Sequence, residues 1–209
     1  MTIETLVVED NKFTRAFFEG LVERQEGLHL AGTLKDAEQA PAFCRINRVD
    51  LILMDVQTQH GHSGLTAAAR IRAEQPGIRI VVVTSLVDAA VLEKARAVGV
   101  DSLWYKDHGE EEVMDVVRRT LAGERIFPDR PPNVEVGSAW SDDLSETQKE
   151  ILRRYIQGDT YAAIGRALFL QERTVKYHMD QMIQKCGFQS KQQLIAAAID
   201  STIVAALDD

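Results

Sequence analysis

The chain has few cysteines and no long apolar run, and both absences exclude classes of protein. Its 209 residues include only two cysteines, Cys44 and Cys186, which lie in different halves and lack metal-ligand spacing. We therefore expect reduced, buried thiols and no disulfide framework. The longest aliphatic runs, such as residues 80–83, are too short to span a bilayer, and residues 1–4 lack the basic start of a signal peptide. These features predict a cytoplasmic protein without a membrane segment.

The chain also lacks an excess of positive charge, with 24 Lys and Arg against 32 Asp and Glu and a net charge of −8. Binding to nucleic acid normally requires a basic face that neutralises phosphates. Residues 1–140 carry 16 basic against 22 acidic residues, and residues 141–209 carry 8 against 10. Residues 173–191 are an exception, with four basic residues and one acidic residue. Binding to DNA is therefore not excluded, but we expect it to be weak or to depend on a dimer.

Short β-rich apolar runs alternate with longer amphipathic stretches through the first 122 residues. The runs have the length of strands, and the stretches between them have the length of helices. Strands are expected at 3–8, 28–33, 50–54, 79–83 and 101–105, and helices at 12–25, 36–47, 65–75, 87–98 and 110–122. Five successive βα units predict an α/β domain with a five-stranded, parallel, doubly wound sheet and helices on both faces.

A proline-rich segment separates this pattern from a helical remainder. Three of the five prolines lie within residues 127–143, which show no sustained periodicity and are interpreted as an exposed linker. Beyond it, Ser145 and Gln148 have capping-box spacing at the start of a helix that Gly158 ends. Further helices are expected at about 161–168, 172–186 and 190–207. We place an N-terminal domain at 1–123, a linker at 124–143 and a small all-α, four-helix domain at 144–209.

Polar side chains of a particular kind follow the predicted strands. Ligands bind at the carboxyl ends of the strands in an open parallel sheet, so these residues are expected to share one crevice. They are Glu9 and Asp10 after the first strand, Asp55 after the third, Thr84 after the fourth and Lys106 after the fifth. Crowded carboxylates need a cation, and a set of oxygen ligands suits Mg²⁺. This chemistry favours attack by one carboxylate on phosphorus, although each acidic residue by itself could simply cap the helix that follows it.

These residues resemble the receiver domain of two-component response regulators. The resemblance covers about residues 3–122 and depends on Glu9-Asp10, on Asp55 in Leu51-Ile52-Leu53-Met54-Asp55, on Thr84 in Val81-Val82-Val83-Thr84, and on Tyr105-Lys106-Asp107. It implies a flavodoxin-like fold and phosphorylation of Asp55 by a histidine kinase. It further implies that Mg²⁺ is held by Glu9, Asp10, Asp55 and the backbone carbonyl of Gln57. Thr84 and Lys106 would contact the phosphoryl group.

The chain departs from the receiver pattern in two places. Thr58-Gln59 replaces the Met-Pro pair that usually follows the phosphorylated Asp, and Gly64 comes one residue late, so we expect a rebuilt loop. The switch position three residues before Lys106 is occupied by Leu103 and not by an aromatic residue. An alternative is therefore a transcription factor of the same architecture that is regulated without phosphorylation. His60 and His62, which lie in the altered loop, are interpreted as solvent-exposed and not as metal ligands.

The third C-terminal helix has one apolar and one polar side. The apolar side is predicted to belong to the core and comprises Val175, Met179, Met182, Ile183 and Cys186. A short helix, a turn at residues 169–171 and this helix make a helix-turn-helix. Residues 142–200 resemble the LuxR-type domain of the NarL/FixJ class through Arg173-Thr174-Val175-Lys176-Tyr177-His178, Lys185-Cys186-Gly187 and Gly158. The resemblance implies base and backbone contacts from Lys176, Tyr177 and Asp180, and Gln171 replaces the usual Ser or Thr cap. With the other residues of the polar side, the predicted DNA-binding residues are Arg173, Thr174, Lys176, Tyr177, Asp180 and Gln184.

The last predicted helix is unusually apolar. Its candidates for a dimer surface are Leu194, Ala197, Ala198, Ile199, Ile203, Ala206 and Leu207, and burial within the monomer is the alternative. We predict a DNA-binding response regulator that is phosphorylated by a sensor kinase, binds promoter DNA as a homodimer and switches through Thr84 and Leu103. An enzyme such as a small phosphatase with Asp55 as nucleophile is the rival class, but no separate substrate pocket is evident, so we do not expect an enzyme.

Overall fold

The computed structural model describes residues 2–106 and 110–204, which fall into two compact units. Residues up to Ser85 together with Leu92–Arg130 form the N-terminal unit. Leu86–Val91 cluster with the residues from Pro131 onward in the C-terminal unit. Among the described residues, none of the helices combines the length and the apolar composition that crossing a membrane requires.

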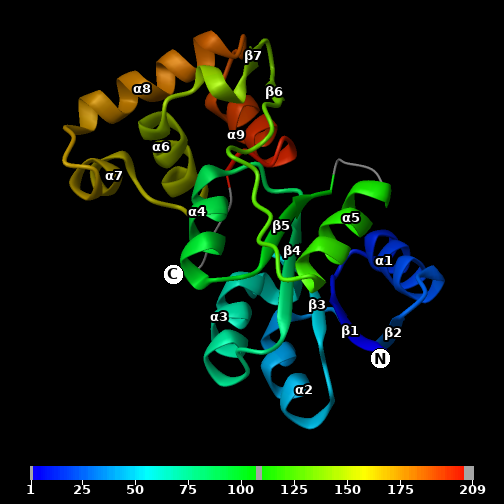
Figure 1. Ribbon diagram of the computed structural model, residues 1–209. Helices are drawn as coiled ribbons and strands as arrows, with labels where there is room; N and C mark the ends of the chain where they lie inside the picture. The colour runs from blue at the N-terminus through cyan, green and yellow to red at the C-terminus, as the bar shows by residue number, and fades with distance from the viewer. Residues whose placement is uncertain (1, 107–109, 205–209) are drawn as a thin grey trace. The chain divides into compact units, whose positions relative to one another are not determined.

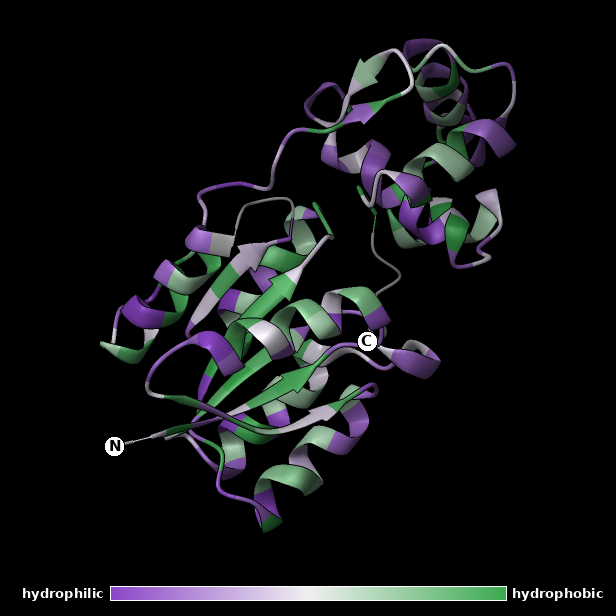
Figure 2. Cartoon of the chain, turned by 90° about the vertical axis from the view of Figure 1, so that its right-hand side faces the viewer, coloured by the Kyte–Doolittle hydropathy of each residue, from purple (hydrophilic) through white to green (hydrophobic). Residues whose placement is uncertain are grey.

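The N-terminal unit is built on a parallel sheet (Figure 1). Its strands are β1 (Ile3–Val8), β2 (Leu28–Leu34), β3 (Leu51–Asp55), β4 (Arg79–Thr84) and β5 (Ser102–Tyr105), in the order β2-β1-β3-β4-β5. The central strands β3 and β4 are buried apart from Arg79, which explains why they are nearly continuous apolar runs without polar alternation. Figure 2 shows these strands as the most hydrophobic part of the unit. The predicted α/β fold with a five-stranded parallel sheet is confirmed.

Helices cover both faces of the sheet. On one face, α1 (Lys12–Arg24) and α5 (Glu110–Leu121) bury apolar side chains against β1, β3, β4 and β5. The core of this face includes Val7, Phe18, Leu53, Val83, Trp104, Val113 and Val117. The other face carries α2 (Ala40–Ile46), α3 (Gly64–Glu74) and α4 (Ala89–Val98) (Figure 1). A short 3-10 helix at Ala37–Gln39 precedes α2, and another lies at Gln59–Gly61.

The C-terminal unit is mostly helical, as predicted. It contains α6 (Glu146–Ile156), α7 (Tyr161–Ala167), α8 (Glu172–Lys185) and α9 (Lys191–Asp200). The predicted capping box is present, because the Ser145 side chain accepts from the backbone N–H of Gln148 and the Gln148 side chain accepts from the N–H of Ser145. Gly158 follows α6 with φ +99°, a conformation that favours glycine.

Two sequence-based expectations for this unit were wrong. The segment interpreted as an exposed linker contains a small antiparallel hairpin of β6 (Glu135–Val136) and β7 (Ala139–Trp140), with Val136 and Ala139 buried. Its turn residue Gly137 lies so close to α8 that an added Cβ would be 2.2 Å from the carbonyl oxygen of Cys186. A contact with a distant part of the chain therefore orders the hairpin. The local sequence pattern does not predict this hairpin. The last helix ends at Asp200 and does not continue towards residue 207, whose surroundings lie outside the described residues.

The connection from β3 to α3 requires a glycine at position 64. The backbone N–H of Gly64 donates to the carbonyl of Val56 at 2.8 Å, which brings the start of α3 against the end of β3. A Cβ at this position would lie 1.8 Å from the carbonyl oxygen of Asp55. The glycine that comes one residue late in the sequence therefore allows a close backbone approach beside Asp55.

Replacing Gly64 with Ala is expected to destabilise the N-terminal unit. The added methyl must displace backbone and not a flexible side chain, so we expect the free energy of unfolding to fall by about 1–3 kcal/mol or more. Urea denaturation measures this change. Gly77→Ala is the matched control, because no atom lies within 4 Å of a Cβ added there and its φ is not positive. Equal stability of the two variants would contradict the proposed steric role of Gly64.

Candidate functional site

Three carboxylates meet at the carboxyl edge of the sheet. Glu9 and Asp10 follow β1, and Asp55 ends β3, which is hydrogen-bonded to β1 in the sheet. One oxygen from each carboxylate lies within 4.8 Å of the others. Glu9 is 1% exposed and Asp55 is 7% exposed, so two of the three acids are largely removed from water. The structure therefore brings together the acidic residues that sequence analysis singled out.

Lys106 places an ammonium group among these carboxylates. Its Nζ lies 2.6 Å from Glu9 Oε2 and 2.8 Å from Asp55 Oδ2, and its side chain is only 14% exposed. Its backbone N–H donates to the carbonyl of Thr84 at 2.9 Å, which holds the end of β5 against the end of β4. The lysine thus neutralises part of the charge that converges from β1 and β3. Asp107, the third residue of its motif, lies outside the described residues.

The protonation of this cluster is shifted by burial and by mutual charge. Burial raises the pKa of Asp55 to about 7, Lys106 opposes this rise, and the neighbouring Glu9 adds to it. Burial alone would lower the pKa of Lys106, but the negative charges of Asp55 and Glu9 raise it by more than burial lowers it. The pKa of Lys106 therefore lies above its ordinary value, and the lysine stays charged. Strongly shifted pKa values of buried groups beside a specific charged partner cluster at functional sites, which makes Asp55 a candidate.

The donor set fits a hard divalent cation. Mg²⁺ prefers a few carboxylate oxygens and keeps several waters or phosphate oxygens in its shell. Glu9, Asp10 and Asp55 offer such oxygens within reach of one another. The Gln57–Ser63 bridge is closed by hydrogen bonds from Thr58 N–H to His62 O and from Gly64 N–H to Val56 O. These two bonds do not use the carbonyl of Gln57, which is compatible with a role as a further ligand.

The two predicted switch residues, Thr84 and Leu103, lie at different distances from the carboxyl edge of the sheet. Thr84 ends β4 one residue after Val83, the partner of Asp55 in the strand register, and is 1% exposed. Leu103 is also buried, but its partner in β4 is Val82. The residue that pairs with Thr84 is Tyr105. Leu103 therefore packs in the sheet interior, two positions below the end of the strand.

The loop after Asp55 is tied to the neighbouring β2–α2 connection. The hydroxyl of Thr58 donates to the carbonyl of His62 at 2.7 Å and accepts from the N–H of Ala37 at 3.0 Å. His62 Nδ1 lies 2.7 Å from Asp36 Oδ1. Although burial opposes it, the hydrogen bond with His62 helps to lower the pKa of Asp36. His60 is exposed as expected, and the His62 side chain is 43% exposed although it also pairs with Asp36. The prediction of a rebuilt loop gains a structural basis.

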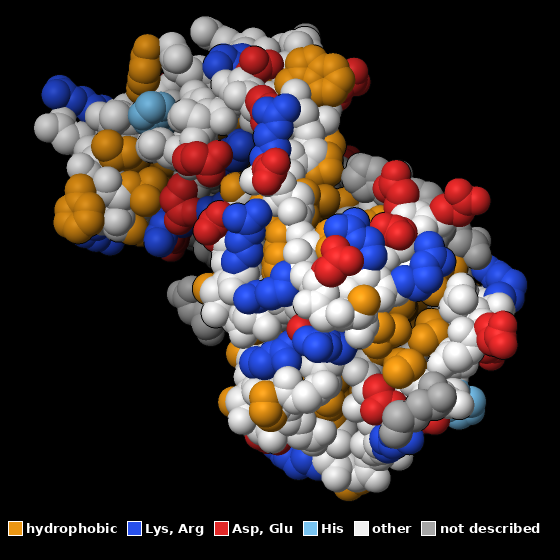
Figure 3. Space-filling model, viewed as in Figure 1, with side chains coloured by type: hydrophobic (Ala, Val, Ile, Leu, Met, Phe, Trp, Pro, Cys, Tyr) orange, Lys and Arg blue, Asp and Glu red, His pale blue; other side chains and the backbone are white. Residues whose placement is uncertain are grey.

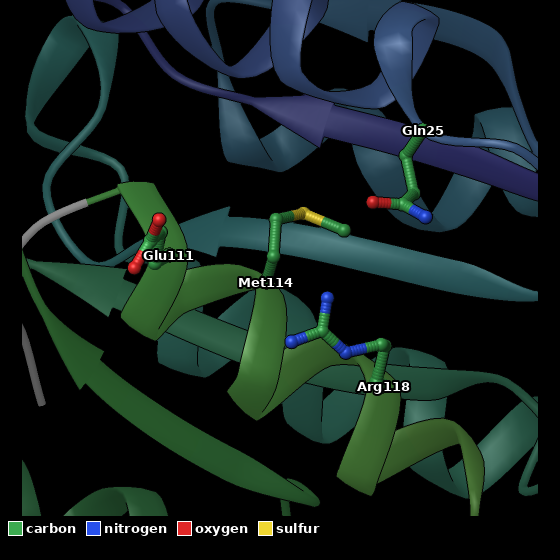
Figure 4. A pocket seen from close by; sticks show the side chains of 4 residues that line it. All are labelled: Gln25, Glu111, Met114 and Arg118. Atoms are coloured by element: carbon green, nitrogen blue, oxygen red, sulfur yellow. The ribbon is translucent and has the colours of Figure 1, made fainter.

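A separate cavity of about 650 Å³ lies beside α5 (Figure 4). Its lining comprises Gln25 after α1 and Glu111, Met114 and Arg118 on α5. It shares no residue with the acidic cluster. The chemistry described above therefore belongs to the open edge of the sheet and not to this cavity.

In the C-terminal unit, α7 and α8 are joined by a tight turn. The N–H of Leu170 donates to the carbonyl of Gly165 at 2.8 Å, and a Cβ at position 165 would lie 2.7 Å from Leu170 O. The helix α8 begins at Glu172, and its N-cap residue Gln171 makes no side-chain cap hydrogen bond, as the missing Ser or Thr suggests. Its buried side comprises Val175, Met179, Met182 and Cys186, with Ile183 half-buried. This arrangement is a helix-turn-helix.

The opposite side of α8 is open to solvent. Arg173, Lys176, Tyr177, Asp180 and Gln184 are all exposed, and Thr174 is half-buried. Tyr177 is 58% exposed and accepts a hydrogen bond from the Gln181 side chain at 2.8 Å. The residues that sequence analysis proposed for DNA contacts are thus accessible, in keeping with that role. Figure 3 shows acidic and basic side chains interspersed on the visible face of this unit.

Three of the seven candidate residues around α9 are internal. Leu194, Ala198 and Ile203 are at most 1% exposed, whereas Ile199 is 52% exposed. Ala206 and Leu207 lie outside the described residues. The interpretation of Leu194, Ala198 and Ile203 as a dimer surface was therefore wrong, because these side chains complete the core of the monomer.

Comparison with known families agrees with both sites. The model of the response regulator receiver domain matches residues 5–118, and the model of bacterial regulatory proteins of the luxR family matches residues 142–198. The chain belongs to the response regulators. In this response regulator, the receiver match contains the acidic cluster with Lys106, and the luxR match contains the helix-turn-helix.

Relatives of similar length support this assignment. The response regulator protein VraR of Staphylococcus aureus (strain Mu3 / ATCC 700698) is 26% identical over 212 residues, which cover 98% of this chain and all of VraR. The uncharacterized transcriptional regulatory protein YxjL of Bacillus subtilis (strain 168) is 28% identical, and the match covers 97% of each chain. A structure of the two-component response regulator RcsB in complex with DNA has a TM-score of 0.61, covers 96% of this chain and 99% of RcsB, and is 15% identical, which shows a shared fold.

The stability of this response regulator is expected to depend on pH through Asp55. Its folded-state pKa of about 7 lies above the ordinary value of 3.8, so the folded state loses stability relative to the unfolded chain as the pH rises from 3.8 to 7. Asp55→Asn removes this penalty, and we expect it to raise the Tm by a few degrees at pH 8 and by less at pH 5. Thermal scans in the presence of EDTA measure both values. An equal gain at both pH values, or a lower Tm at pH 8, would contradict the shifted pKa.

Proposed function

We propose that this response regulator accepts a phosphoryl group on Asp55 from a sensor histidine kinase and thereby controls its binding to promoter DNA. The observation that supports phosphorylation of Asp55 is the position of the Lys106 ammonium group. It lies within 2.8 Å of both Glu9 and Asp55 at the edge of the sheet. An ion pair needed only for stability would not require three converging carboxylates. The intact set of acids and lysine favours phosphorylation over regulation without it.

In the proposed transfer, a carboxylate oxygen of Asp55 attacks phosphorus in line. A bond forms between Asp55 Oδ and phosphorus, and the bond from phosphorus to the donor histidine nitrogen breaks, with its electron pair going to that nitrogen. Asp55 must be deprotonated to attack. Lys106 and Thr84 are positioned at the same edge to contact the phosphoryl oxygens.

Glu9, Asp10, Asp55 and the backbone carbonyl of Gln57 are the proposed ligands of Mg²⁺. When bound, this cation supplies positive charge between the carboxylates and the phosphoryl oxygens. Glu9 is pre-oriented for this role, because its Oε1 accepts from the N–H of Asn11 at 3.1 Å while its Oε2 pairs with Lys106. We further propose that Thr84 and Leu103 report the phosphorylated state, with Leu103 in the position of the usual aromatic residue.

The proposed DNA-binding surface is the open side of α8. Arg173, Lys176 and the polar groups beside them supply donors for phosphates and base edges. The contacts are proposed to come from Arg173, Thr174, Lys176, Tyr177, Asp180 and Gln184. Because residues 141–209 carry eight basic against ten acidic residues, two copies that bind adjacent half-sites would provide the affinity that one copy lacks. We therefore propose a homodimer on promoter DNA in the cytoplasm, with 1–123 as receiver, 124–143 as connecting segment and 144–209 as DNA-binding domain.

Asp55→Asn is expected to abolish phosphorylation. The amide cannot attack phosphorus, so acetyl phosphate with Mg²⁺ should shift the wild-type protein on a phosphate-affinity gel and leave the variant unshifted. Asp50→Asn is the matched control, because Asp50 precedes the same strand at its opposite end. An undiminished shift of Asp55→Asn would refute the assignment of the phosphorylated residue. Loss of the shift in both variants would indicate damage to the fold.

Lys176→Ala is expected to weaken DNA binding across sequences and to change its salt dependence. Loss of one phosphate contact should reduce the slope of log K against log salt by about 1. The probe is a duplex selected from a random library by the full-length wild-type chain, titrated by fluorescence anisotropy at several salt concentrations. Lys12→Ala, an exposed lysine at the start of α1, serves as control. An unchanged slope and affinity would remove Lys176 from the DNA interface.

A further inference from the structure

The turn of the helix-turn-helix holds an apolar side chain in an unfavourable setting. Phe169 has φ +56°, the left-handed region that non-glycine residues rarely adopt. Its side chain is also 96% exposed, more than any other large apolar residue among those described. A strained backbone costs of order 1 kcal/mol, and a phenyl group in water forgoes the stabilisation that burial would bring. The free domain therefore gains nothing evident from a phenylalanine at this position.

The turn itself does not require the phenyl group. It requires a left-handed residue, because Leu170 N–H must return to the carbonyl of Gly165 immediately after α7 ends. Glycine or asparagine meets that requirement at lower cost. The flanking residues Leu168 and Leu170 are half-buried and supply the apolar packing. The backbone of Phe169 thus serves the fold, while its side chain points away from it.

The position of Phe169 relates it to the proposed DNA surface. It lies two residues before Gln171, the N-cap of α8, and four before the exposed Arg173. The N-terminal residues of a recognition helix enter the major groove, so the turn that precedes them lies at the edge of the groove. The exposed phenyl group therefore precedes the end of α8 that carries the exposed Arg173 and Lys176.

We propose that Phe169 is a DNA contact whose phenyl ring packs against apolar carbon atoms of the duplex, either thymine methyl groups or deoxyribose. Phenylalanine is among the side chains that make apolar contacts with the thymine methyl group. This inference rests on the proposed DNA binding through α8. It also answers a difficulty of the sequence, because residues 141–209 carry only eight basic against ten acidic residues and so offer few groups that neutralise phosphates. An apolar contact adds affinity that does not depend on counterion release.

Phe169→Gly tests the proposal, because glycine relieves the backbone strain and removes the ring. On the selected duplex we expect roughly tenfold weaker binding, in proportion to the burial of one aromatic side chain. The slope of log K against log salt should stay unchanged, unlike that of Lys176→Ala. The Tm should be equal to or above that of the wild type. Phe169→Leu, which keeps an apolar group, should retain most of the affinity, and Phe13→Ala, which removes another exposed phenyl ring, should bind as wild type.

The outcomes separate this proposal from its alternatives. Unchanged affinity of Phe169→Gly, with weakened binding of Lys176→Ala, would overturn the role of Phe169 and leave DNA binding intact. A weaker affinity with a reduced salt slope would also overturn it, because phosphate contacts would then be lost. A change in oligomeric state without DNA would assign the ring to a second copy of the chain. Failure of the wild type to select any duplex would instead refute the proposed function.

Replacing thymine by uracil at single positions of the selected duplex distinguishes the two kinds of apolar carbon. If one such position weakens the wild type and leaves Phe169→Gly unaffected, the partner is a thymine methyl group. If Phe169→Gly loses affinity equally on the thymine and uracil duplexes, the partner is deoxyribose. Both results support an apolar DNA contact.

Discussion

The crowding of negative charge at one edge of the sheet is the constraint that shapes the N-terminal unit. Carboxylates from the ends of β1 and β3 lie within 4.8 Å of one another and repel unless a cation neutralises them or one of them is protonated. Lys106 reaches Glu9 and Asp55 from β5 across the end of β4. The strand order β2-β1-β3-β4-β5 makes this possible, because β1 and β3 are neighbours and only β4 separates β3 from β5. This geometry also requires Gly64, since a side chain there would push α3 away from the Asp55 backbone.

This arrangement could be predicted from the sequence because the carboxyl ends of parallel strands all lie at the same edge of the sheet. Each fully buried strand is a continuous apolar run, and the first polar residue after it lies at the same edge as its counterparts. Glu9, Asp55 and Lys106 can be identified in that way without knowledge of their contacts. The helices of the C-terminal unit are predictable for a similar reason, because their apolar periodicity and the Ser145 capping box are local signals.

The features that the sequence did not reveal depend on contacts between distant segments. The pairing of Asp36 with His62 joins two loops that are 26 residues apart, and neither residue belongs to a pattern that identifies the other. The hairpin at Gly137 is ordered by the end of α8. Around α9, the sequence showed more apolar residues than a small domain needs, and only the packing decided that Leu194 and Ala198 are internal. Local patterns carry no information on which distant segment covers a given residue, so these features require the folded chain.

The two functional surfaces handle charge in different ways. At the receiver edge, burial strengthens electrostatics, so a single lysine can hold carboxylates together and oppose the rise in the pKa of Asp55 that burial causes. Along α8, the basic groups are exposed and screened by salt, and each contributes little. An acidic chain that must bind a polyanion therefore benefits from groups that act without charge. The exposed ring of Phe169 beside the start of α8 is such a group. In the proposed complex, the affinity that the ring adds offsets the stability that its strained backbone costs the free domain.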